Sequence, residues 1–420
     1  MSSPLHRRAF HSLVRRLAEA RRRSPDGEVV SGHHNTNLIL PLGRPLAFLL
    51  GESSGHVLAK FRTPLQAVEV VPRIWRRESE VLGALRGRLS QVPRCLADFG
   101  EWSLHDYLPG RALADEVPAG RIGEARVAAL AEFFAGLAGV READLPPLPA
   151  DWPVDGDSRG FLGWLARFAE QKVHQANRPR FGRLFDDVGI PFDAVERFMA
   201  SVPKLTARPF VLLHTDVHRA NVLIVDDPET LDERLAVIDW ELALYGDPLH
   251  DLATHLVRMD YDESEYDLML ELWTKAMLDA GHADMTADQE RDLDAYLGFE
   301  YVQSLYPDVM RAALYLPDDP GEQDLAAAAG RVRRALSRAM QPLSLAGEPF
   351  DEQQIREALR RWHSADGEWR TRADDGGEGA AQGEIAGPAE VRKWRTYRSR
   401  TERAERPAPD RQREPTGVHS

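Results

Sequence analysis

The feature that most constrains the fold of this chain is a set of apolar runs interrupted by a polar loop. An apolar run at residues 210–213 is followed by the polar residues 214–221, and the apolar pattern resumes at 222–224. A third apolar run, residues 235–238, ends directly on Asp239. Buried strands on both sides of a polar loop hold the loop side chains in fixed positions. The pattern therefore predicts a functional loop between two strands, close to the end of a third strand.

The polar residues of these segments have the composition of a phosphoryl-transfer site. Asp216 and Asn221 are five positions apart in the loop, and Asp239 ends the third run. One carboxylate can orient or deprotonate a substrate hydroxyl, while an Asn and an Asp can hold magnesium against nucleotide phosphates.

Two other interpretations start from the same residues. His214, Asp216 and His218 alternate, so on a strand they would face one side and could form the metal cluster of a hydrolase. Further His and Asp ligands at a suitable spacing are missing from the pattern, which disfavours this interpretation. The strands could also belong to an unrelated α/β domain whose loop merely carries polar residues.

The order and spacing of these residues resemble those of a known family. His-x-Asp-x-x-x-x-Asn at 214–221, followed by Ile-Asp-Trp at 238–240, is similar to the aminoglycoside phosphotransferase and choline kinase-like family. The continuation Gly-Asp-Pro-Leu-His-Asp-Leu-Ala at 246–253 also resembles that family, and the resemblance covers roughly residues 29–345. It implies an α+β, bilobal protein-kinase-like fold, with a small β-rich N-terminal lobe and a larger, mostly helical C-terminal lobe.

The resemblance also implies roles for individual residues. Asp216 would be the catalytic base or the carboxylate that orients the hydroxyl. Asn221 and Asp239 would bind magnesium. His214 would shape the loop rather than move protons, and Asp251 would have a structural role, anchoring the catalytic loop.

A lysine-bearing strand lies in the N-terminal part of the chain. Residues 56–61, His-Val-Leu-Ala-Lys-Phe, look like the family's V-A-x-K strand. A lysine inside an apolar strand is costly unless the strand lies at a sheet edge or the lysine meets an anion. By the resemblance, Lys60 would hold the α- and β-phosphates of the nucleotide and pair with a glutamate on a helix.

The glutamate partner is predicted from helical spacing in residues 76–85. Leu82 and Leu85 follow Glu78 by four and seven positions, which places Glu78 on their inward face. Glu78 is therefore the predicted partner of Lys60, with Glu80 as the alternative.

Two backbone segments are predicted to contact the nucleotide. The turn after the strand-like residues 29–30 contains Gly32, His33, His34 and Asn35, and by the resemblance it would cover the phosphates. A plain hairpin turn is the alternative. Residues 93–110 resemble the hinge between the lobes, where the backbone at Asp106, Tyr107 and Leu108 would meet the adenine base. The Pro-Gly pair at 109–110 is typical of a turn and marks the boundary.

The domain boundaries follow from these segments and from composition. We predict a basic N-terminal helix at 1–24, an N-terminal lobe at 25–107, a C-terminal lobe at 108–363 and a disordered tail at 364–420. The basic helix either docks its apolar stripe on the protein, frays, or lies on a membrane surface. The tail is rich in Gly, Glu, Arg and Pro and has too little apolar surface to fold alone.

Charge and cysteine content exclude some classes of function. The formal net charge of −14 argues against a general nucleic-acid binder. The chain has one cysteine, so it cannot form an intrachain disulfide, and a cytoplasmic location is expected. No secretory signal and no apolar run of bilayer length are seen. Acidic residues are concentrated at 249–295, where they could attract a polycationic substrate or form a solvated helix face.

The predicted activity is therefore transfer of the γ-phosphoryl group of ATP, with magnesium, to a hydroxyl group. GTP is the alternative nucleotide, because some members of the family use it. The leading acceptor is a small amino-bearing molecule such as an aminoglycoside. A Ser or Thr side chain of a biosynthetic precursor peptide, or a pseudokinase scaffold without activity, are the alternatives.

Overall fold

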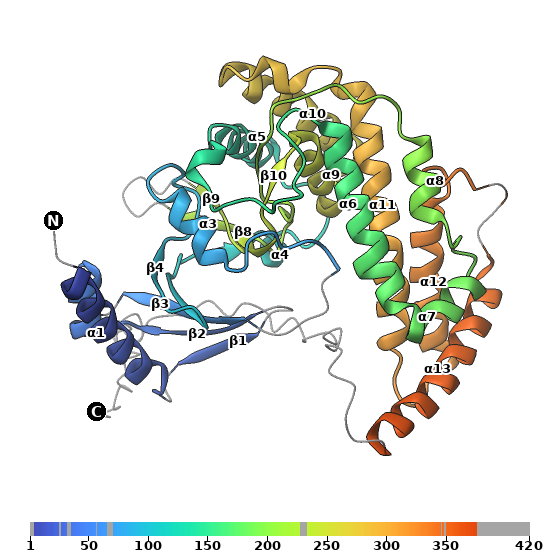
Figure 1. Ribbon diagram of the computed structural model, residues 1–420, viewed down its shortest axis with the longest axis horizontal. Helices are drawn as coiled ribbons and strands as arrows, with labels where there is room; N and C mark the ends of the chain where they lie inside the picture. Colours follow the sequence, from blue (N-terminus) through green and yellow to red (C-terminus); the bar gives the residue numbers. More distant parts are fainter. Residues whose placement is uncertain are drawn as a thin grey trace, which may run out of the picture.

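The computed structural model describes residues 4–24, 27–31, 35–55, 57–64, 70–226, 233–345, 347 and 350–375. Two lobes are visible in Figure 1, a small one built on an antiparallel sheet and a larger, mostly helical one. The predicted α+β class and bilobal arrangement are confirmed. Among the described helices, none has both the length and the apolar content needed to cross a bilayer.

The N-terminal lobe contains a five-stranded antiparallel sheet of order β1-β2-β3-β5-β4. Its described elements are α1 (Pro4–Arg22), β1 (Glu28–Ser31), β2 (Asn35–Pro41), α2 (Arg44–Leu50), β3 (Leu58–Pro64), α3 (Glu78–Leu85), β4 (Cys95–Asp98) and β5 (Ser103–Asp106). Side chains alternate between the two faces of a strand. On β3, Ala59 and Phe61 are buried in the lobe's apolar cluster, so Lys60 and Arg62 share the opposite face.

Helix α1 docks on this lobe, as one of the sequence interpretations predicts. Val14 and Ala18 are 3% and 0% exposed and belong to the same apolar cluster as Leu40 and Leu46. Phe10 and Leu13 remain about half exposed, at 49% and 48%. The apolar stripe of α1 is thus only partly covered, while Arg21 and Arg22 bond to the lobe at the Pro41 carbonyl and the Thr63 hydroxyl, at 2.6 and 2.8 Å.

The C-terminal lobe begins after a short connection at residues 107–110. Its described elements are β6 (Arg111–Ala112), α4 (Leu113–Glu116), α5 (Glu124–Ala138), η1 (Glu142–Asp144), α6 (Ser158–Phe168), the π-helical η2 (Ala169–Gln175), α7 (Ala176–Asp187), α8 (Ala194–Ser201), β7 (Val211–Leu213), β8 (Val222–Asp226), β9 (Glu233–Val237), η3 (Trp240–Leu242), β10 (Leu244–Gly246), α9 (Pro248–Met259), α10 (Glu263–Asp279), η4 (Ala283–Thr286), α11 (Gln289–Leu314), α12 (Glu322–Ala339) and α13 (Glu352–Asp375).

Two small antiparallel sheets in this lobe carry the predicted loop. β7 pairs with β10, and β8 lies between β6 and β9. The loop at 214–221 therefore connects β7 of one sheet to β8 of the other. The connection between the lobes is tight at Gly110, where an added Cβ would lie 2.6 Å from the Ile224 carbonyl oxygen. Glycine is needed there because any side chain would collide with β8.

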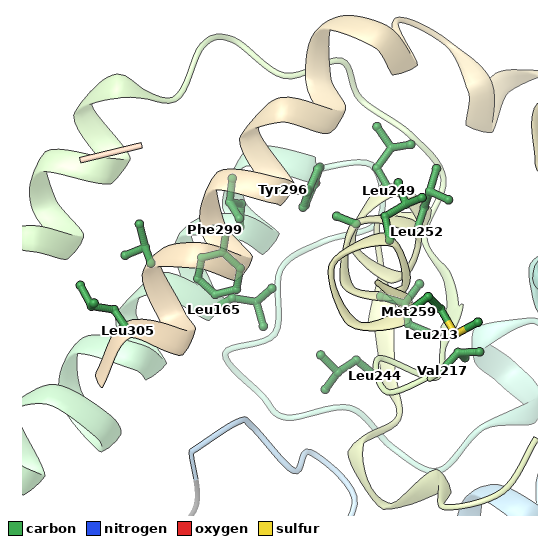
Figure 2. Close-up of a cluster of buried hydrophobic side chains, with 14 of the residues drawn as sticks. Leu165, Leu213, Val217, Leu244, Leu249, Leu252, Met259, Tyr296, Phe299 and Leu305 are labelled. Atoms are coloured by element: carbon green, nitrogen blue, oxygen red, sulfur yellow. The ribbon is translucent and has the colours of Figure 1, made fainter. Parts of the chain in front are cut away.

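The core of the larger lobe supports the loop directly. Figure 2 shows Leu213 and Val217, which lie on either side of residues 214–216 of the loop, close to Met259 at the end of α9. All three are nearly inaccessible to solvent, with exposed fractions of 1% or less. Burial of apolar side chains contributes about 1.5–3 kcal/mol each. The loop is therefore held just before its start, by Leu213, and near its middle, by Val217, and neither side chain can leave the core cheaply.

The predicted start of a disordered tail at residue 364 is wrong. Helix α13 continues to Asp375, past the predicted boundary between the C-terminal lobe and the tail. Asp366 is 4% exposed and forms a bidentate ion pair with Arg180 of α7, at 2.7 and 3.0 Å. This part of the helix is thus packed against α7 beyond the point where its composition becomes polar. Residues 376–420 lie outside the described part of the chain.

Several acids of the region 249–295 have structural partners rather than a solvated position. The fully buried Glu265 carboxylate accepts hydrogen bonds from the Ile122 and Gly123 backbone N–H groups, at 3.1 and 2.8 Å. Asp292, also fully buried, accepts a hydrogen bond of 2.7 Å from Arg208. Other acids of this region, such as Asp279, are exposed. Some acids of this region are therefore buried with hydrogen-bond partners, and others lie on the surface.

Candidate active site

Asp251, near the start of α9, anchors the loop between β7 and β8. Its two carboxylate oxygens accept hydrogen bonds from the backbone N–H groups of His214, at 2.7 Å, and Thr215, at 2.8 Å. Thr215 has a φ of 62°, in the left-handed region, and its hydroxyl donates to the Leu242 carbonyl at 2.7 Å. A non-glycine residue in this region costs about 1–3 kcal/mol and needs such support. The predicted structural role of Asp251 is confirmed by these contacts.

Burial raises the pKa of the Asp251 carboxyl well above its ordinary value. Desolvation raises the pKa of its carboxyl to about 7, although the two backbone hydrogen bonds act in the opposite direction. The carboxylate is thus ionised at the upper end of the physiological range, where it accepts both N–H groups.

His214 shapes the loop, as predicted. Its Nε2 lies 3.1 Å from the Ile238 carbonyl, and its Nδ1 accepts a hydrogen bond from the Asp216 N–H at 3.2 Å. Burial lowers its pKa to about 4, so the ring is neutral at physiological pH. Because both ring nitrogens are used in these contacts, His214 does not join Asp216 and His218 in a metal cluster. In the described part of the chain, no group of three or more His, Cys, Asp or Glu residues could hold a metal ion.

Asp216 lies at the centre of the loop and is held from several directions. Asn221 Nδ2 donates to Asp216 Oδ2 at 2.9 Å and to the Asp216 carbonyl at 3.0 Å. His218 Nε2 lies 3.5 Å from Asp216 Oδ1. The side chain of Asp216 is 14% exposed. Burial acts to raise its pKa, but the charge of Arg258 and the contact with His218 outweigh burial and hold the pKa well below its usual range.

Asp239 follows β9 and faces the same site. The backbone N–H of Ile238 bonds to the Asn221 carbonyl at 2.9 Å, which fixes the end of β9 beside the end of the loop. Asp239 has a φ of 71°, and its side chain is 34% exposed. Its pKa is lowered, because the Arg62 charge outweighs the effect of burial. The structure therefore brings Asp216, Asn221 and Asp239 together, although they come from two separate strand ends.

Glu78 is the inward-facing glutamate of α3. It is 8% exposed, with Leu82 and Leu85 buried on the same side, whereas Glu80 forms a surface ion pair with Arg77 at 2.5 Å. Glu78 Oε1 accepts a hydrogen bond of 2.9 Å from the Trp240 N–H. Glu78 thus faces inward, as helical spacing predicts, and the structure connects it to the residue that follows Asp239.

The contact that the structure shows for Glu78 Oε2 is with Arg62, which the sequence analysis missed. Arg62 Nε lies 2.7 Å from Glu78 Oε2, and Arg62 Nη2 lies 2.5 Å from Asp239 Oδ1 and 3.3 Å from Glu241. Pairing of Glu78 with Lys60, which the sequence also predicts, stays a prediction. Arg62 follows Lys60 by two positions, so the period of a strand was the signal that could have revealed it.

Lys60 lies on the same face of β3 as Arg62. It is opposite Ile39 of β2 and His105 of β5. Burial and the Arg62 charge lower its pKa, while the charges of Glu78 and Asp239 act to raise it. Lys60 is thus within the electrostatic influence of both carboxylates, and its proposed role as a phosphate ligand remains a prediction.

The two predicted nucleotide-contacting segments are only partly described. Gly32, His33 and His34 lie outside the described residues. The hairpin that carries them is present, because β1 pairs with β2 as far as Ser31 and Thr36, and Asn35 begins β2. A role for these residues in binding phosphates stays a prediction.

The predicted hinge occupies the expected place between the lobes. Asp106 ends β5, and its carboxylate accepts hydrogen bonds from the Arg94 backbone N–H at 2.7 Å and from Arg94 Nε at 2.8 Å. The Tyr107 N–H donates to the Leu58 carbonyl at 3.3 Å, and Leu108 follows in the connection to β6. The side chain of Asp106 is thus used to brace the connection. Contact of this backbone with a base stays a prediction.

A second arginine that the sequence analysis did not select is also in the site. Arg258, in the last turn of α9, forms an ion pair between its Nη1 and Asp216 Oδ1. Its side chain is 30% exposed. No local motif marks this arginine, because α9 packing alone brings it to the loop.

The sequence also matches a model of a known protein family. Residues 44–287, which include β3, α3, the loop and Asp239, match the phosphotransferase enzyme family. The chain belongs to the phosphotransferase enzyme family. The resemblance seen in the motifs at 214–221 and 238–253 is therefore confirmed.

Individual relatives of this phosphotransferase-family chain are distant. Choline/ethanolamine kinases of Rattus norvegicus and Mus musculus are each 22% identical over 275 residues, which is 62% of this chain and 63% of the relative. The chain thus spans less than two thirds of the length of these curated relatives. Among solved structures, Plasmodium vivax ethanolamine kinase is 10% identical, with a TM-score of 0.48, covering 77% of this chain and 85% of that one. A choline/ethanolamine kinase family protein from Mesorhizobium loti is 16% identical, with a TM-score of 0.45, covering 83% and 98%.

Proposed function

We propose that this protein transfers the γ-phosphoryl group of ATP to a hydroxyl group of a small, amino-bearing molecule. The observation that carries the proposal is the convergence of Asp216, Asn221 and Asp239 in a chain of the phosphotransferase enzyme family. In this arrangement, Asp216 orients the acceptor hydroxyl. Its low pKa makes it a weak base, so positioning contributes more than proton removal before the attack.

The residues present fit a magnesium ion between Asn221 and Asp239. Amide and carboxylate oxygens are ligands that magnesium accepts, and it completes its shell with nucleotide phosphates and water. The side chain of Asp239 is one-third exposed, so it is accessible to such an ion. When bound, magnesium neutralises charge on the phosphates. Lys60 on β3 is the proposed phosphate ligand of the chain itself, and Arg62 braces Glu78 and Asp239 around it.

The amino-bearing acceptor is proposed from the relatives. Choline and ethanolamine, named in the descriptions of the curated kinases, each combine a hydroxyl with a nitrogen cation or amine. The net charge of −14 favours the approach of a cationic acceptor. ATP is proposed as the donor, with GTP as the alternative to be compared.

The experiment is a transfer assay with magnesium and γ-labelled ATP or GTP. Acceptors would be small amino-alcohols, aminoglycosides and a size-fractionated cell extract. We expect label in small molecules with the native sequence. We expect Asp216→Asn to lower transfer by about a hundredfold or more, because the hydroxyl loses its orienting carboxylate. Binding of a fluorescent ATP analogue should be retained, since the base is proposed to bind at residues 106–108 rather than at Asp216.

Asp279→Asn is the matched control, because Asp279 is an exposed carboxylate on α10 with a surface partner only. Label in polypeptide would contradict the small-molecule acceptor and favour a peptide kinase. Near-normal turnover of Asp216→Asn would contradict the role of Asp216. Absence of both transfer and nucleotide binding would contradict the enzymatic function as a whole.

A further inference from the structure

Arg258 has an unusual position for a structural arginine, because it lies directly against the carboxylate that would orient the acceptor. Its Nη1 contacts Asp216 Oδ1, the oxygen that faces away from Asn221. Within the part of the chain that the structure describes, Asp216 is the hydrogen-bond partner of Arg258. A guanidinium carries several N–H donors in a planar fork, so most of its hydrogen-bonding capacity is unused here.

Arg219, a neighbour in the loop, shows what a structural arginine looks like in this protein. Its Nε, Nη1 and Nη2 donate to the backbone carbonyls of Met259, Val117 and Gly120, at 2.9, 2.9 and 2.6 Å. Arg219 is 8% exposed. Arg258, by contrast, has 30% of its side chain exposed beside the catalytic carboxylate. Arg219 thus uses its N–H donors in hydrogen bonds and is buried, whereas Arg258, in the described part of the chain, has unused donors and is partly exposed to solvent.

Holding Asp216 in place does not by itself require Arg258. Asn221 already fixes Asp216 Oδ2 and the Asp216 carbonyl, and the Asp216 N–H is bound to His214. A cation on Oδ1 also makes Asp216 a weaker base. A pair with only a structural purpose would therefore weaken the carboxylate in catalysis without any gain in return. The placement is useful if an anion arrives next to Asp216 during the reaction.

We propose that Arg258 binds the transferring phosphoryl group on the acceptor side of the reaction centre. This inference rests on the proposed function. The bond between the acceptor oxygen and the γ-phosphorus forms while the bond from that phosphorus to the β–γ bridging oxygen breaks. ADP leaves with that electron pair, and the hydroxyl proton passes by way of Asp216 to solvent. Arg258 remains protonated throughout and neutralises charge on the equatorial oxygens.

The geometry favours this role because the cations of the site would then lie on both sides of the moving group. Lys60 and Arg62 come from β3 of the small lobe, on the nucleotide side. Arg258 comes from α9 of the large lobe and reaches the same centre through Asp216. An anionic group on the acceptor itself is the other possible source of an anion for Arg258, and the experiment separates the two.

The test measures binding of MgADP with and without aluminium fluoride, which mimics the planar phosphoryl group in transfer. Water takes the place of the acceptor hydroxyl. We expect aluminium fluoride to tighten MgADP binding to the native protein by about tenfold or more. Arg258→Met should bind MgADP alone within about twofold of the native protein but show no tightening. Arg258→Lys, which keeps the charge without the fork, should show a partial effect.

Arg311→Met is the matched control, because Arg311 is an arginine on the neighbouring helix α11 whose side chain is 43% exposed and paired with Asp308. It should retain full tightening. Equal tightening in Arg258→Met and the native protein would overturn the inference and leave the proposed function intact; the anion at Arg258 would then be part of the acceptor. Failure of the native protein to bind MgADP would overturn the proposed function and this inference together.

Discussion

At the scale of single residues, one strand carries two cations with different surroundings. Lys60 and Arg62 share a face of β3, and Arg62 directly contacts Glu78, Asp239 and Glu241. The side chains of Arg62 and Glu78 are only 10% and 6% exposed. Removing one partner of a buried ion pair leaves an uncompensated charge, which is more costly than losing the pair as a whole.

We predict that Arg62→Met lowers the free energy of unfolding by about 3–5 kcal/mol. Lys60→Met, on the same face of the same strand, is the matched variant. It should cost less than about 1.5 kcal/mol, because Arg62 still neutralises Glu78, while raising the KM for ATP. Urea denaturation and nucleotide-dependent kinetics measure the two effects. Equal losses of stability would show that Lys60 and Arg62 share the neutralisation of Glu78.

At the scale of secondary-structure elements, helix α1 depends on a narrow contact with the small lobe. Val14 and Ala18 are inside the apolar cluster of that lobe, and the neighbouring residue Leu13 is 48% exposed. Adjacent residues on a helix point about 100° apart, which explains how one is buried and the next is not. The sequence showed an amphipathic pattern, but it did not show which apolar residues would be covered.

We predict that Val14→Asp destabilises the protein by about 3 kcal/mol or detaches α1, because it places a charge in an apolar cluster. Leu13→Asp should change stability by less than about 0.5 kcal/mol, since this side chain already meets solvent. Chemical denaturation with limited proteolysis in the N-terminal segment would measure both effects. Similar behaviour of the two variants would mean that α1 is not docked through Val14.

At the scale of the whole molecule, buried neutral histidines couple folding to pH. Burial lowers the pKa of His255 to about 4, from 6.5, and the ring lies 2.9 Å from the Val217 carbonyl and 3.0 Å from the Tyr261 hydroxyl. Below pH 6.5 the unfolded chain binds a proton that the folded chain does not. The stability contributed by neutral His255 is therefore present above pH 6.5 and is lost as the pH falls toward 4. Asp251, with a pKa of about 7, acts in the opposite direction, so its contribution falls as the pH rises from 4 to 7.

Comparing a His255 variant with the native protein separates the pH dependence due to His255 from that due to Asp251. We predict that His255→Gln is less stable than the native protein at pH 7, because the ring contacts are lost. The difference should shrink by about 3 kcal/mol between pH 7 and pH 4, since Gln does not titrate. Urea denaturation at a series of pH values measures this, with the exposed His11→Gln as the control. A difference that is constant with pH would contradict the neutral, buried state of His255.

The sequence by itself determined the family and the strand–loop–strand frame, and it predicted the residues of the candidate site. Asp216, Asn221 and Asp239 were identifiable because they follow apolar runs at short, regular spacing. Glu78 was identifiable because helical periodicity places it with Leu82 and Leu85. These signals are local, and local spacing is read directly from the chain.

The tertiary structure alone decided the partners of these residues. Arg62 and Arg258 meet the site through a neighbouring strand register and through the packing of α9, which no short motif encodes. The contact of Asp366 in α13 with Arg180, far away in the sequence, is likewise not visible in any local pattern. Ion pairs between distant segments depend on how the lobes and helices pack. Composition and periodicity therefore predict which charged residues face the interior, but not which residue each of them pairs with.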